Sequence, residues 1–115
     1  MVYNQEFLND YLEYIKSTFN TLEEVANEII RNEGNDNKIK AVFEDYINLV
    51  KLMDFCIEKD SFFVLNTEKA LSVLKDTMTI YESNDLILLY DFMYYAMANE
   101  IMLMFQSLDA KLLES

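Results

Sequence analysis

The sequence predicts a single all-α domain over residues 1–115: a mainly antiparallel four-helix bundle with long first and last helices. The chain has one glycine and no proline, and because turns and sheets depend on these residues, the connections must be few and short. At 52% hydrophobic, 115 residues can bury a real core despite a net charge of −12. Apolar residues also recur at helical spacing along almost the whole chain.

The first helix is predicted over Gln5–Arg31, with Asn4 as its N-cap. Thr21–Glu24 resembles a capping box that could start another helix, but the apolar sector keeps its phase through it, so we expect one continuous helix. Gly34 is placed to take the left-handed position that ends the helix. The predicted buried sector consists of Phe7, Leu8, Tyr11, Leu12, Ile15, Phe19, Leu22, Val25, Ala26, Ile29 and Ile30.

A second helix is predicted over Lys38–Glu58, capped by Asp36 or Asn37. Leu52 and Phe55 lie off its main apolar face, which leaves solvent exposure, wider burial or a partner as explanations. The main face is Ile39, Val42, Phe43, Tyr46, Leu49, Val50, Met53 and Ile57.

The segment Lys59–Asn66 is the one sizeable connection, and Phe62–Leu65 fall out of phase with the helix that follows. We therefore expect these apolar side chains to plug one end of the bundle. The third helix is predicted over Thr67–Glu82, and the short turn Ser83–Asp85 makes the third and fourth helices antiparallel neighbours. The third helix carries a stripe of Ala70, Leu71, Leu74, Met78 and Tyr81.

The last helix, predicted from Asp85 to Leu113, is the most apolar segment and is apolar on two sides. Such a helix is either covered on both sides or partly exposed to a partner. Its predicted core face is Leu86, Tyr90, Tyr94, Met97, Ile101, Met104, Leu108 and Leu112, flanked by Ile87 and Phe105. The second apolar face, a candidate interface, is Leu88, Leu89, Phe92, Ala96 and Leu103.

A candidate polar strip of Asp91, Tyr95 and Asn99 separates the two faces. Tyr95 lies one turn after Asp91, so Tyr95 or a backbone group could satisfy a half-buried Asp91 carboxylate, or the strip could make polar contacts inside an interface. The methionines of this region could fill the core or line an adaptable binding groove; they are Met78, Met93, Met97, Met102 and Met104.

The imbalance of 21 acidic to 9 basic residues argues against nucleic-acid and anionic-membrane partners, whose binding depends on Lys and Arg. It either keeps an apolar protein soluble or suits a basic partner. The longest uncharged runs of the last helix are far shorter than the roughly 18 residues of a membrane span, so we expect no membrane association. The lone Cys56 and the absence of a signal-peptide pattern favour the cytoplasm.

The residue types exclude several chemistries. The chain has no histidine, which removes Ser-His and Cys-His nucleophile pairs and the usual zinc and di-iron sites. A calcium loop starting at Glu33 fails because Lys38 stands where glycine is required. We therefore expect no catalytic residues, no metal, no cofactor and no enzymatic activity.

Two resemblances centre on the start of the last helix. The pattern Asp85-x5-Asp91-x3-Tyr95 resembles an uncharacterised group of small helical-bundle proteins of Gram-positive bacteria, which implies a bacterial bundle without known activity. The run Ser83-Asn-Asp-Leu-Ile-Leu-Leu-Tyr-Asp91 is similar to a signature of flagellar secretion chaperones, which are helical bundles that wrap the tail of an export substrate.

The predicted function is a cytoplasmic, non-enzymatic protein–protein interaction module: an adaptor, a chaperone-like bundle or an immunity-type bundle. It would bind a protein partner, or a second copy as a homodimer, through apolar surface of the last helix. One alternative is an acidic decoy that imitates nucleic acid. The other is an enzyme that works with carboxylates alone, because 21 acidic side chains could bring two together.

Overall fold

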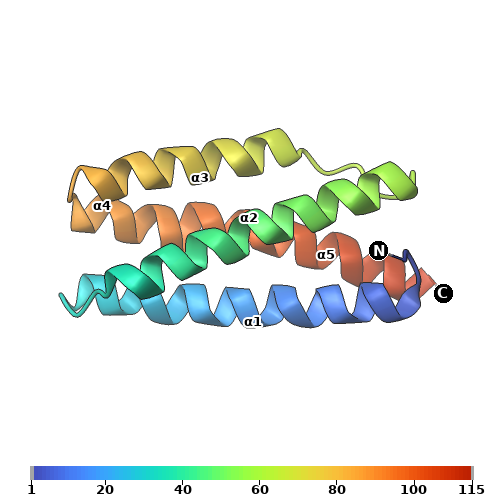
Figure 1. Ribbon diagram of the computed structural model, residues 1–115, viewed down its shortest axis with the longest axis horizontal. Coiled ribbons are helices and arrows are strands. Elements are labelled where there is room, and N and C mark those ends of the chain that lie inside the picture. Colours follow the sequence, from blue (N-terminus) through green and yellow to red (C-terminus); the bar gives the residue numbers. More distant parts are fainter. Residues whose placement is uncertain (1, 115) are drawn as a thin grey trace.

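The computed structural model describes residues 2–114 and confirms an all-α four-helix bundle. Four rods run alternately up and down, so the two chain termini lie at the same end (Figure 1). The molecule measures 44 × 22 × 21 Å. The rods are α1 (Gln5–Ile30), α2 (Asp36–Lys59), α3 (Thr67–Glu82) and a final rod made of α4 (Leu86–Asp91), η1 (Phe92–Met97) and α5 (Ala98–Glu114).

Each rod begins at a residue whose side-chain oxygen accepts a hydrogen bond from a backbone amide of the first turn, as N-caps do. The caps are Asn4, Asn35, Asn66 and Asp85. The sequence-based cap of α2 is wrong by one or two residues, because Asn35 accepts from both Asn37 and Lys38.

The end of α1 also differs from the prediction. Asn32, with φ 60°, takes the left-handed conformation, while Gly34 has no positive φ. Asparagine tolerates this region because its short polar side chain bonds locally. The Glu33 amide then donates to the Glu28 carbonyl at 2.8 Å, which closes the helix end.

The rods pack in the order α1, α2, α3, final rod and back to α1. The amphipathic spacing of the sequence explains this arrangement, because each rod turns its apolar stripe inward. The largest fully buried side chains are Tyr46, Ile15, Leu22, Leu49, Met53, Leu89, Met93, Met97, Ile101, Leu108, Val42 and Val50.

The connection between α2 and α3 covers the end of the bundle that α3 does not reach (Figure 1). Its plug is mainly Phe63, which is buried, whereas Phe62 and Val64 are exposed and Leu65 is half-buried. The predicted plug of four side chains is therefore smaller than expected. The off-face residue Phe55 of α2 is explained by its edge-on contact with the ring of Phe7, 5.4 Å between centroids.

Tyrosine hydroxyls fasten the elements to one another. Within the described residues, five of the eight tyrosines donate a hydrogen bond to a group on a distant segment of the chain. The bonds join Tyr3 to Asp60 at 2.5 Å, Tyr11 to the Leu49 carbonyl at 2.6 Å, Tyr14 to Asp45 at 2.8 Å, Tyr46 to the Ala70 carbonyl at 2.7 Å, and Tyr81 to Asp36 at 2.6 Å.

One helix of the described chain, the continuous rod Leu86–Glu114, is long and apolar enough to cross a membrane by length and composition alone. A third of its most apolar stretch is buried in the bundle. The core helix of a bundle meets the same criterion.

Candidate interaction surface

The final rod contains one π-helical segment, Phe92–Met97, between two α-helical segments. In a π turn the hydrogen bonds run five residues back, so each turn holds one more residue than an α-helix. Residues before such a turn are rotated by one position, about 100°, relative to a uniform α-helix. Periodicity assumes uniform rotation, so the sequence could not reveal this shift.

The π turn changes which side chains before it enter the core. Leu89 and Met93 are buried, with exposed fractions of 1% and 0%, in place of the predicted Leu86 and Tyr90. Leu86 is 45% exposed and Tyr90 is half-buried. After the π turn the predicted face is correct, because Met97, Ile101, Met104 and Leu108 are all buried.

The predicted second apolar face is therefore divided. Leu89 belongs to the core, so its assignment to an exposed interface is wrong. Phe92 and Ala96 are half-buried in η1, the segment against which α3 packs. Leu88 and Leu103 are partly exposed. The α3 rod thus accounts for much of the apolar character on this side of the rod.

The predicted polar strip lies on the surface. Asp91 and Asn99 are exposed, and Tyr95 is 62% exposed. The expectation of a half-buried Asp91 is wrong, and the Tyr95 ring packs on Tyr90 and Tyr94 instead. Because solvent reaches the Asp91 carboxylate, no tyrosine is needed to satisfy it.

Three tyrosines on and beside the π turn form what we call the tyrosine cluster: Tyr90, Tyr94 and Tyr95. Tyr90 and Tyr94 stack at 5.2 Å between ring centroids, and Tyr95 meets Tyr94 edge-on at 5.1 Å. In residues 2–114 none of the three hydroxyls donates a hydrogen bond to another side chain or to the backbone. Desolvation and the neighbouring Tyr95, Tyr94 and Asp91 raise the pKa of Tyr90.

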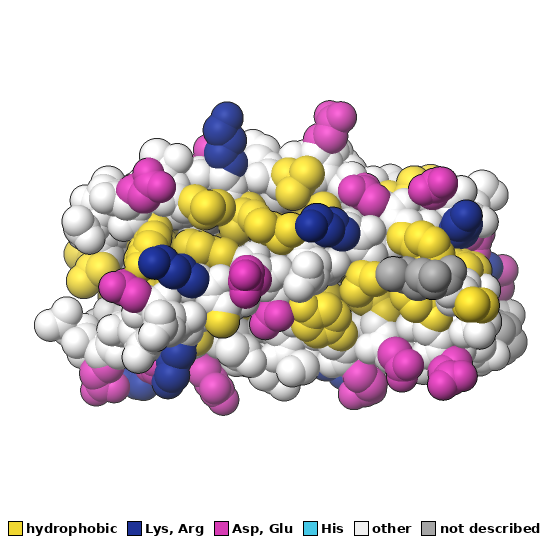
Figure 2. Space-filling model, in the orientation of Figure 1, with side chains coloured by type: hydrophobic (Ala, Val, Ile, Leu, Met, Phe, Trp, Pro, Cys, Tyr) yellow, Lys and Arg dark blue, Asp and Glu magenta, His cyan; other side chains and the backbone are white. Residues whose placement is uncertain are grey.

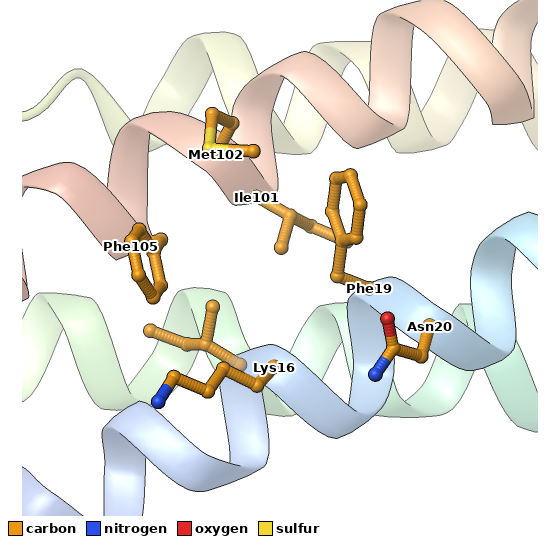
Figure 3. Close-up of a pocket in the computed structure, with 7 residues that line it drawn as sticks. Lys16, Phe19, Asn20, Ile101, Met102 and Phe105 are labelled. Atoms are coloured by element: carbon orange, nitrogen blue, oxygen red, sulfur yellow. The ribbon is translucent and has the colours of Figure 1, made fainter.

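A groove between α1 and α5 lies further along the same rod. It encloses about 210 Å³ and is lined by Ile15, Lys16, Phe19, Asn20, Ile101, Met102 and Phe105. The Phe19 side chain extends from α1 toward α5, and the Phe105 side chain extends from α5 toward α1. Met102 lies on the α5 side (Figure 3). Met102 lies two helical turns after Tyr95, so the groove and the tyrosine cluster project from similar sides of the rod.

The five methionines of this region differ in burial. Met93, Met97 and Met104 are core residues, whereas Met78 and Met102 are partly exposed. Met102 is the one that lines the α1–α5 groove. Tyr94 and Tyr95 are visible in the sequence as an aromatic pair, but the sequence does not show that Tyr94 is half-buried against the core while Tyr95 is exposed.

A second region of apolar surface lies on another side of the molecule. Figure 2 shows hydrophobic side chains gathered between α3 and α2, interrupted by charged side chains. On α3 itself Leu71 and Met78 are partly exposed, although both belonged to the predicted core stripe, while Thr77 is buried. The Thr77 hydroxyl donates to the Val73 carbonyl at 2.7 Å, which explains how α3 buries a polar residue there.

The described part of the chain holds no group of three His, Cys, Asp or Glu side chains able to bind a metal ion. Cys56 is buried, and burial together with the Asp60 charge raises its thiol pKa to about 11. No family model, curated protein or solved structure matches this chain. The two resemblances drawn from the start of the last helix therefore remain predictions.

Proposed function

We propose that this protein is a non-enzymatic interaction module that binds an amphipathic helix of a basic partner protein. The binding surface would consist of the tyrosine cluster and the α1–α5 groove. The observation that carries this proposal is the contrast among tyrosines: Tyr90, Tyr94 and Tyr95 have no hydroxyl partner within residues 2–114, while the other five fasten the fold.

The residue types of this surface support a protein partner. Tyrosine, phenylalanine and methionine are enriched at interfaces because they bring apolar area and, in tyrosine, a hydroxyl for orientation. The thioether of Met102 can repack against different partners. An apolar groove between two helices, with Lys16 and Asn20 among its lining residues, suits the apolar face of a third helix.

The charge of the chain favours a basic partner over a second copy. Each copy carries a formal net charge of −12, so self-association brings like charges together. Asp91 is exposed beside the tyrosine cluster and can meet a basic side chain. Complementary charge speeds encounter and selects partners, while the apolar contacts provide most of the affinity.

Photocrosslinking from the surface itself tests this proposal. The photoreactive residue p-benzoylphenylalanine would replace Tyr95 in one variant and Leu71, exposed on α3, in the control. We expect position 95 alone to capture a partner. Peptides made from its crosslinked segment should be amphipathic and basic, and should bind the unmodified protein in fluorescence anisotropy. Tyr95→Ser with Met102→Ser should weaken that binding at least about 30-fold, as loss of interface hot spots does.

Three outcomes contradict the proposal. Equal capture at both positions indicates non-specific contact, and capture of a second copy replaces the basic partner by a homodimer. Binding that disappears steeply with added salt supports the acidic decoy instead, because screening removes a purely electrostatic complex. An apolar interface should lose little affinity over the same range of salt.

A further inference from the structure

The cavity around Glu100 is independent of the proposed interaction surface. It encloses about 200 Å³ between the N-terminal end of α3, α2 and α5. We propose that it is a binding site for a small organic amine, with the ammonium group at the Glu100 carboxylate and an apolar body against the walls. Its lining residues are Met53, Leu65, Asn66, Thr67, Lys69, Ala70, Glu100, Leu103 and Met104.

Glu100 is the buried charge of this cavity. It is 5% exposed, although carboxylates are seldom buried unless they are well paired. Its one ion pair or hydrogen bond within residues 2–114 is the contact with the Lys69 ammonium, 3.9 Å from carboxylate oxygen to nitrogen. That distance is longer than a charge-assisted hydrogen bond, so the carboxylate retains capacity for a closer donor.

The Lys69 ammonium can leave this position at little cost. Its side chain is 63% exposed, so water can solvate the ammonium as soon as it moves away. Glu100 has less freedom, because it lines the cavity and only 5% of its surface is exposed. A ligand ammonium can therefore take the place of Lys69, and the exchange keeps the buried carboxylate paired with a cation.

Tyr46 of α2 lies near enough to Glu100 to be affected by its charge. Its hydroxyl is already used, since it donates to the Ala70 carbonyl at 2.7 Å. Burial, and then the charge of Glu100, raise the pKa of this tyrosine. Tyr46 is therefore close enough to be affected by the Glu100 charge, but its hydroxyl does not donate a hydrogen bond to the Glu100 carboxylate.

The walls select an apolar body for the ligand. Met53 and Met104 are buried side chains of the lining, and Leu65 and Leu103 add apolar area. Thioethers adjust to different shapes, so the cavity can close around a ring or a short chain. An apolar cavity of about 150 Å³ can hold benzene, so a cavity of about 200 Å³ has room for a ligand with one ring and a short chain, such as phenethylamine.

Methyl NMR of the methionines tests this assignment with three probes of similar shape. The protein would be titrated with phenethylamine, with the neutral phenethyl alcohol and with the anionic 3-phenylpropanoate. We expect phenethylamine alone to shift the methyl signals of Met53 and Met104 in a saturating manner. The signals of Met78 and Met102, both partly exposed and outside the cavity, serve as internal controls and should stay in place.

Two substitutions separate recognition from simple apolar binding. Glu100→Gln should weaken phenethylamine binding at least about tenfold, because it removes the charge and keeps the shape. Lys69→Met should strengthen binding, because it removes the ammonium that competes with the ligand for the Glu100 carboxylate. An unchanged affinity in either variant overturns the proposal.

The probes provide further contradicting outcomes. Equal shifts with the alcohol and the amine, or no shift with any probe, overturn the amine site. Nα-acetyl-lysine methylamide, a model of a protein lysine, distinguishes the source of the ammonium. If it binds more tightly than phenethylamine, the cavity receives a partner's lysine and the free-amine assignment is wrong.

Discussion

The eight tyrosines of this chain form two groups that differ in their surroundings and not in their chemistry. Each of five tyrosines donates a hydroxyl hydrogen bond to a distant segment of the chain: Tyr3, Tyr11, Tyr14, Tyr46 and Tyr81. The tyrosine cluster on the π turn stacks on itself, and its Tyr95 is 62% exposed. The difference teaches that the position of a tyrosine on its helix, and not the residue type, decides whether its hydroxyl bonds to a distant segment of the chain or only its ring packs on neighbouring tyrosines.

The largest expected effect tests the rotation itself. Leu89→Ala or Met93→Ala should lower the free energy of unfolding by about 2–5 kcal/mol, because each leaves a cavity in the core. Leu86→Ala, at a 45% exposed position, should lower it by less than about 1 kcal/mol. Urea unfolding of the three variants measures the difference. The opposite ranking would mean that the rod is a uniform α-helix and that the tyrosine cluster turns inward.

A pair of single-residue deletions sharpens the same point. Deleting Gln106 from α5 rotates the residues after it by about 100° and takes Leu108 out of the core, at a cost of about 2–5 kcal/mol. Deleting Tyr95 removes the extra residue of the π turn, so α4 keeps its position and the cost should be within about 1 kcal/mol. Thermal unfolding followed by circular dichroism compares the two. Equal losses would contradict the π turn.

Removing single hydroxyls tests the division of the tyrosines. Tyr11→Phe and Tyr46→Phe should each lower the free energy of unfolding by about 0.5–1.5 kcal/mol, the net worth of a buried hydrogen bond. Tyr95→Phe should leave it unchanged within about 0.5 kcal/mol, because its hydroxyl has no protein partner in the described chain. The same urea assay applies. A loss at Tyr95 as large as that at Tyr46 would remove the distinction between the two groups.

A smaller effect is expected on the pH dependence of stability, through the hydrogen bond from Tyr3 to Asp60. The Tyr3 hydroxyl, the Phe62 amide and the Lys111 ammonium, at 2.5, 3.0 and 3.0 Å, lower the pKa of Asp60 to about 2. A lowered pKa in the folded state adds stability above about pH 4, and that stability is lost as the pH falls toward 2. After solvent screening we expect a loss of about 1 kcal/mol.

The control for this prediction is Asp60→Asn. This variant should show a shallower fall of stability between pH 4 and pH 2 than the parent protein, because position 60 no longer takes up a proton. The difference between the two proteins cancels the protonation of the other carboxyl groups. Parallel pH profiles would mean that Asp60 does not hold the N-terminal segment, the α2–α3 connection and the C-terminal turn together.

Much of the fold followed from local rules that operate uniformly along the chain. The apolar sector of α1 stayed in phase through Thr21–Glu24, and α1 is indeed one helix ending at Ile30. The single glycine and the absence of proline predicted that the connections are short. The errors at Asn32 and Asn35 arose because several Asn and Asp residues in a row can all cap a helix, and only the packing of α1 on α2 selects among them.

The candidate surface was less predictable, for physical reasons. Leu89 and Leu86 are the same residue type at positions that periodicity assigns to opposite roles, and a single extra residue in η1 exchanges them. Leu103 is exposed beside the α3 end, and the length of α3 relative to the final rod cannot be read from either helix alone. The burial of Glu100 could not be predicted from the sequence, because it depends on the path of the α2–α3 connection, which has no repeating pattern of apolar residues.

The most direct test of the account is the reactivity of single cysteines placed at Leu86 and at Leu89. Cys56 provides a low background, because it is buried and its pKa is raised to about 11. A maleimide should label Leu86→Cys at least about tenfold faster than Leu89→Cys, since only a thiol that water reaches reacts readily. Faster labelling at position 89 would contradict the rotation at the π turn, and with it the surface position of Tyr95 on which the proposed function depends.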